Sequence, residues 1–155
     1  MPSLNQSQLE ALTPYRLGRR VDKAAATLPA TTNQTLFTIT GGRVLLFQII
    51  GEVTTIIQAQ ACNAKLTSAP TTGTAVDMCA VVDVNGKEAG SLLSIDGVLA
   101  TAMAANNAGA AALMSRPQAI PIGVIRLNTS ATNTGATKWS AWYVPLDDGA
   151  LMVSG

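Results

Sequence analysis

The chain has 155 residues, enough for one domain with a substantial core. Charged residues make up 12% of the chain, about half the usual share, and the formal net charge is +1. This balance argues against a nucleic-acid-binding domain, which normally carries a basic patch. Histidine is absent, so the commonest general base and metal ligand is missing, and we expect neither a metal nor a cofactor. A mean hydropathy of +0.29 indicates that a partner chain covers part of the outer surface.

Residues 1–30 differ in composition from the remainder and are predicted to form an N-terminal arm. Ser7 and Glu10 have the spacing of a helix capping box, and Pro14 would end the short helix that follows. The charged side chains of the arm are Glu10, Arg16, Arg19, Arg20, Asp22 and Lys23. We expect the arm to lie on another surface, with a hinge near Pro29. The alternative is a frayed terminus without a role.

Residues 31–155 alternate between short apolar runs and turn residues, which predicts strands. The expected strands are 35–39, 43–50, 52–66, 76–84, 91–95, 119–127, 138–144 and 150–153. Tight turns are predicted at Asn85-Gly86 and at Asp147-Asp148-Gly149. The pattern therefore predicts a single all-β, antiparallel domain, either a sandwich or a barrel.

The charge-free, alanine-rich stretch 97–115 is predicted to be a short helix or an ordered loop. Asn106, Asn107 and Gly109 make it too weakly apolar to span a membrane. The first residues also lack the basic and apolar regions of a secretory signal, so we expect reduced thiols. Cys62 and Cys79 lie in apolar runs and are predicted to be buried and free, the alternative being a disulfide across a hairpin.

Candidate catalytic groups are few, and we expect no enzyme. Asp147 and Asp148 are neighbours in a predicted turn. Asp77 and Asp83 share one face of a predicted strand about 20 Å apart, too far to act together. Three N-x-S/T strings, at Asn5, Asn33 and Asn128, are interpreted as chance in a chain rich in Ser and Thr.

The aromatic residues near the C-terminus alternate along the strand predicted at 138–144. Trp139 and Tyr143 fall on one face, which we interpret as the core side, and Trp142 falls on the other. Trp142 is therefore predicted to contact a partner, at an interface between protomers. The alternative is that Trp139, Trp142 and Tyr143 form a platform that binds sugars.

Five segments resemble the capsid decoration (cement) proteins of tailed bacteriophages. They are residues 23–29, 36–44, 51–55, 127–135 and 143–150. The resemblance implies a β-sandwich or jelly-roll-like fold without enzymatic activity. It also implies homo-oligomers, often trimers, that are made in the host cytoplasm and bind the major capsid protein on the outside of the virion. Neither nucleic acid nor a membrane is an expected partner.

Residues 1–22 have no counterpart in the resemblance, so the role of the arm is an inference from its charges. We expect the arm to dock on the capsid through guanidinium groups and leucines. The predicted docking residues are Leu9, Leu12, Arg16, Leu17, Arg19 and Arg20. The alternative function is a carbohydrate-binding β-sandwich module of a phage head fibre or receptor-binding appendage.

Overall fold

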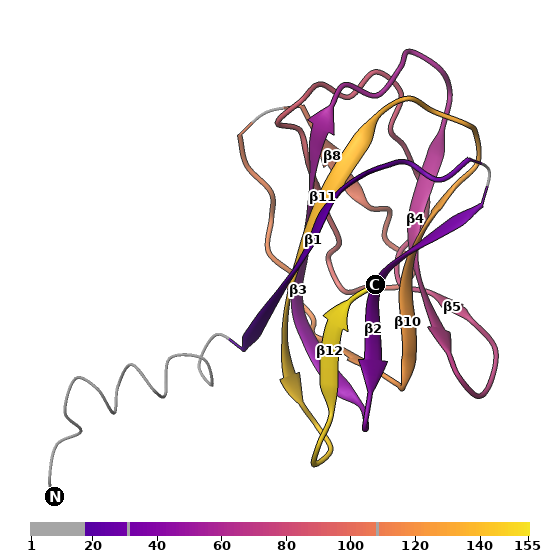
Figure 1. The fold of residues 1–155 in the computed structure, drawn as a ribbon. Helices are drawn as coiled ribbons and strands as arrows, with labels where there is room; N and C mark the ends of the chain where they lie inside the picture. The colour runs from indigo at the N-terminus through magenta and orange to yellow at the C-terminus, as the bar shows by residue number, and fades with distance from the viewer. Residues whose placement is uncertain (1–17, 31, 108) are drawn as a thin grey trace, which may run out of the picture.

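The computed structural model describes residues 18–30, 32–107 and 109–155, which form two six-stranded sheets packed face to face (Figure 1). The first sheet has the order β1 (Arg19–Thr27), β11 (Ala136–Pro145), β3 (Val44–Thr55), β7 (Leu92–Ser94), β8 (Ala104–Asn106), with β9 (Gln118–Ile120) also on β3. The second has the order β12 (Leu151–Ser154), β2 (Asn33–Thr40), β10 (Gly123–Thr129), β4 (Asn63–Pro70), β5 (Val76–Asp77), with β6 (Val82–Asp83) also on β4. All strand pairs are antiparallel, which confirms the predicted β-sandwich.

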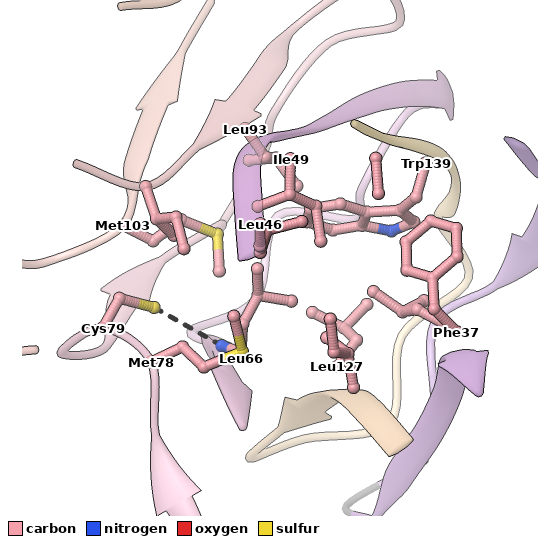
Figure 2. Close-up of a cluster of buried hydrophobic side chains, with 14 of the residues drawn as sticks. Phe37, Leu46, Ile49, Leu66, Met78, Cys79, Leu93, Met103, Leu127 and Trp139 are labelled. Carbon is pink, nitrogen blue, oxygen red and sulfur yellow. Dashed lines mark hydrogen bonds between the residues drawn. The ribbon is translucent and has the colours of Figure 1, made fainter. Parts of the chain in front are cut away.

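The core lies between the sheets and is built from the inward-facing residues of each strand. Figure 2 shows Leu46 and Ile49 of the first sheet opposite Leu66 and Leu127 of the second. Trp139 and Tyr143 face this core and are buried, whereas Trp142 between them faces outward, as the alternation predicted. Cys62 and Cys79 are buried and free, so the prediction of two separate thiols is confirmed and the disulfide is excluded.

Strand β3 runs through Gly51, where the sequence predicted a break between two strands. The predicted end of the strand at Gly51 is wrong, because this glycine is needed for side-chain packing within the strand. A Cβ atom at this position would lie 2.8 Å from the ring of Trp139 on the neighbouring strand β11. Glycine lets the large indole sit directly on the backbone of β3. The predicted strand 52–66 is consequently two strands, since β3 ends at Thr55 and β4 begins at Asn63.

Two further predicted strands are divided. The run 76–84 contains only the two-residue strands β5 and β6, with Ala80 between them bridging to Ala102. The run 119–127 is split at Pro121, so that β9 joins the first sheet and β10 joins the second. Proline cannot donate a ladder hydrogen bond, and it stands where the chain crosses between the sheets. The described residues of the stretch 97–115 contain no helix, so that predicted form is wrong, and the predicted ordered loop is interrupted by strand β8, which the sequence did not predict.

The predicted boundary of the arm at residue 30 is wrong, because residues 19–27 belong to the sandwich. Strand β1 pairs with β11 from Arg19 opposite Tyr143 to Thr27 opposite Ala136. Val21 packs against the core, and Lys23 Nζ donates to the carbonyl oxygen of Gly155 beside β12. Arg20 and Asp22 alternate with Val21 and Lys23 and lie on the opposite, outer face of the strand. A solvated strand edge therefore has the same composition as the arm that the sequence suggested.

Candidate interaction surface on strands β1 and β11

The outer face of β1 and β11 brings together two residues that were predicted to serve different interfaces. Arg20, expected to dock on a capsid, lies directly opposite Trp142, expected between protomers. Arg19 is the other predicted docking residue in the described part of the chain, one position earlier on the same strand. The remaining predicted docking residues, Leu9, Leu12, Arg16 and Leu17, lie outside the described residues.

The Arg20 guanidinium lies over the ring of Trp142, with its central carbon 5.3 Å from the ring centroid. This is cation–π distance. Strand pairing creates the contact, since residues opposite one another in a ladder place their side chains on the same face. Trp142 is half-buried and Arg20 is exposed, so both groups remain open to a partner.

Asp22 and Ser140 hold Arg20 in this position. Arg20 Nε donates to Asp22 Oδ1 at 2.9 Å, and the Ser140 hydroxyl donates to the same oxygen at 2.5 Å. The hydrogen bond from Ser140, and after it the contact with Arg20, lower the pKa of Asp22 below its ordinary value, although desolvation opposes them. The carboxylate is therefore ionised at neutral pH, and it balances the charge of the guanidinium.

A shallow hollow of about 750 Å³ lies at the end of β11 and the start of β12. Arg19 lines it together with Leu146 and Leu151, both of which are more than 40% exposed. Nearby, Asp147 accepts three hydrogen bonds from Arg43, through the backbone N–H, Nε and Nη2, at 2.7–2.9 Å. The side chain of Arg19 has no carboxylate partner among the described residues. The hollow thus combines two exposed leucines with the guanidinium of Arg19.

The three aromatic residues near the C-terminus do not form a sugar-binding platform. Trp139 and Tyr143 are each only 1% exposed. Trp139 Nε1 donates to Thr137 Oγ1 at 3.0 Å, and the hydroxyl of Tyr143 lies 3.5 Å from the carbonyl oxygen of Met152. Trp142 alone among these three reaches the surface.

The acidic residues considered as catalytic candidates have structural partners. Asp77 pairs with Lys65 at 2.7 Å, and Asp83 accepts the backbone N–H groups of Cys62 and Asn85 at 3.0 Å. Within the described ranges, no three Cys, Asp or Glu side chains lie close enough together to hold a metal ion. The described part of the chain also contains no helix with the length and apolar character needed to cross a membrane.

Sequence reasoning missed Asp22 and Ser140 as parts of this surface. The spacing of Arg20 and Asp22 offered a signal, because residues two apart on a strand share a face. That signal required residues 19–27 to be recognised as a strand. No protein-family model, curated protein or solved structure matches the chain.

Proposed function

We propose that this is a structural virion protein that decorates and stabilises the outside of a tailed-phage capsid, as a trimer at three-fold positions. The observation that carries the proposal is the Arg20–Trp142 pair on the outer face of β1 and β11, where Arg20 is exposed and Trp142 is half-buried. Tryptophan and arginine are the residue types most enriched among the dominant contacts of protein interfaces. The resemblance of five segments to cement proteins supplies the partner, the major capsid protein, and the sandwich is the fold that this resemblance implies.

The stabilising action in this proposal is contact alone. Trp142 buries its ring against the capsid, while Arg20, held by Asp22, adds a directed charge at the edge of the contact. The hollow with Leu146, Leu151 and Arg19 is a separate surface, because Arg19 and Arg20 are neighbours on β1 and their side chains lie on opposite faces. One exposed ion pair contributes only about 0–1 kcal/mol, so the apolar anchors carry most of the binding energy.

A trimer multiplies this contact. Local and true three-fold axes occur between the capsomers of an icosahedral shell, so a cyclic trimer matches the symmetry of its target. Three linked copies bind with a high effective concentration once the first has docked. Such a trimer bridges neighbouring capsid subunits and resists their separation.

The test is binding of purified protein to phage heads that lack it. We expect Trp142→Ala to weaken binding about tenfold or more and Arg20→Ala to weaken it less. Arg116→Ala is the matched control, because Arg116 is an exposed arginine elsewhere on the molecule. Circular dichroism checks the fold of each variant. Head binding by Trp142→Ala equal to that of the unaltered protein would contradict the proposed surface.

Two measurements on the same variants sharpen the result. Light scattering separates the two uses of this face: a variant that stays trimeric but binds heads weakly assigns the face to the capsid, whereas loss of the trimer assigns it to the contact between protomers. A glycan-binding screen addresses the carbohydrate alternative. Saturable glycan binding without any binding to heads would replace the proposed function.

A further inference from the structure

The turn after β6 contains the only Asn-Gly pair in the sequence, Asn85-Gly86. The carbonyl oxygen of Val84 accepts the backbone N–H of Lys87 at 3.3 Å, which closes a turn with Asn85 and Gly86 at its two central positions. Gly86 has a φ of +63°, a conformation that glycine adopts without strain. The sequence predicted this turn, and the side chain of Asn85 is not needed to close it.

The side chain of Asn85 is exposed and free. Its amide makes no hydrogen bond to any residue that the structure describes, whereas the backbone N–H of Asn85 donates to Asp83 Oδ1 at 3.0 Å. Other asparagine side chains are held by hydrogen bonds, namely those of Asn106, Asn128 and Asn133. The Asn85 amide can therefore turn toward the next peptide nitrogen, that of Gly86.

The peptide nitrogen of Gly86 is only weakly engaged. Its N–H donates to the carbonyl oxygen of Gln58 at 3.3 Å, longer than an ordinary N–H···O bond. That carbonyl oxygen also accepts the backbone N–H of Gln60 at 2.8 Å, so it keeps a partner when Gly86 withdraws. A Cβ atom at Gly86 would meet no atom within 4 Å, so the space beside this residue is open.

We propose that Asn85-Gly86 is a self-modification site, at which the asparagine loses ammonia and becomes aspartate or isoaspartate. The Gly86 nitrogen attacks Cγ of Asn85, its proton leaves with the side-chain NH₂ group as ammonia, and a closed succinimide ring remains. Water then adds to one of the two ring carbonyls. Cleavage at Cγ gives aspartate, and cleavage at the main-chain carbonyl gives isoaspartate, in which the backbone runs through the side chain. The reaction consumes water and needs no oxidant or reductant.

The products change the charge and the path of the turn. Conversion of the amide to a carboxylate lowers the formal net charge of the chain from +1 to zero. The new carboxylate stands two residues from Asp83, whose Oδ1 already accepts the backbone N–H groups of Cys62 and Asn85 at 3.0 Å. Isoaspartate also inserts a methylene group into the main chain of the turn. The Arg20–Trp142 surface lies on other strands, so the proposal holds whether or not the protein decorates a capsid.

The experiment incubates the native full-length protein in mildly alkaline water enriched in heavy oxygen and follows the asparagines by peptide mapping and mass spectrometry. We expect the peptide that contains Asn85 to incorporate heavy oxygen, to split into aspartate and isoaspartate forms, and to release ammonia in equal amount. The rate should lie within about tenfold of that of the urea-unfolded protein, because the turn adds little to the barrier. Asn107, an exposed asparagine followed by alanine, is the internal control and should stay unmodified over the same period.

Two variants complete the test, and both should fold because the side chain of Asn85 has no hydrogen bond to lose. Asn85→Ser removes the amide and should lose both the heavy-oxygen incorporation and the ammonia release. Asn85→Asp carries the new charge from the start and should focus at the isoelectric point of the modified protein. An intact Asn85 in the native protein, when the unfolded protein reacts, would overturn the proposal, because the turn would then protect the amide. Equal modification of Asn107, or no reaction in either state, would overturn it as well.

Discussion

Arg43 and Asp147 join two turns at one end of the sandwich, the turn before β3 and the turn between β11 and β12. The side-chain and backbone hydrogen bonds from Arg43 hold the pKa of Asp147 well below its ordinary value. A carboxyl group whose pKa is lower in the folded state stabilises the fold above its unfolded pKa of about 4. This stabilisation is lost as the pH falls from about 4 toward the folded-state pKa.

Asp147→Asn is therefore expected to lower the free energy of unfolding at pH 7. The difference from the unaltered protein should shrink at pH 3, where the unfolded chain already binds the proton. Urea unfolding at the two pH values measures both effects. Asp148→Asn is the matched control, since Asp148 is exposed and forms no ion pair among the described residues. A constant difference between pH 7 and pH 3 would contradict the role given to Asp147.

The two cysteines have separate buried sites. Cys62 Sγ lies 3.7 Å from the carbonyl oxygen of Ala131, and Cys79 Sγ accepts the backbone N–H of Leu66 at 3.4 Å (Figure 2). Burial raises the pKa of the Cys79 thiol, which lowers its thiolate fraction and reactivity. We expect the native protein to react slowly with a thiol reagent and the urea-unfolded protein to react with two equivalents. Fewer than two equivalents after unfolding without reductant would indicate a disulfide.

Because strand β1 belongs to the sandwich, removal of N-terminal residues that include β1 is expected to destabilise the fold. Its pairing with β11 covers an edge of the first sheet, and Val21 adds to the core. A truncated chain that begins at Gly18 keeps these contacts and is the reference for a shorter chain that lacks β1. Removal of residues through Thr27 uncovers β11 and should lower the melting temperature by about 5 °C or more. Differential scanning calorimetry compares the two chains, and equal melting temperatures would mean that β1 adds nothing to the fold.

The local sequence pattern predicted some elements correctly, because their conformation depends only on residues that are close together in the chain. The alternation of Trp139, Trp142 and Tyr143 follows from strand geometry alone, and the structure confirms it. Gly51 could not be interpreted this way, because its reason is an indole ring that arrives from residue 139. Charges at Arg19, Arg20 and Asp22 likewise looked like an arm, since the edge position that tolerates them depends on a strand more than a hundred residues later.

The hollow beside Arg19 could not be predicted from the sequence for the same reason. It joins β1 to residues 144–151. This combination has no fixed spacing along the chain. It arises from the order of strands within the sheets, which short-range patterns do not encode.

At the scale of the whole molecule, the surface composition supports an oligomer. Among the described residues, ten large apolar side chains are more than a third exposed, including Phe47, Leu146 and Leu151, and the chain has few charges. A protein with so few charges is expected to cover part of this apolar area with copies of itself. The resemblance to cement proteins implies three copies. We therefore predict a trimer of about 48 kDa, three times the 15.9 kDa chain, in multi-angle light scattering.

The trimer model also predicts how one substitution at a contact changes the mass of the oligomer. A ring of three copies uses two different patches on each copy, so a change in one patch breaks all three contacts at once. Leu151→Asp, at an exposed position in the hollow beside Arg19, should shift the mass toward 15.9 kDa if that hollow is one of the patches. Val81→Asp is the control, since Val81 is 49% exposed but lies outside this hollow. A stable monomer of the unaltered protein at micromolar concentration would refute the trimer. A trimer that survives Leu151→Asp would instead leave the hollow free for the capsid, because two partners cannot occupy one surface.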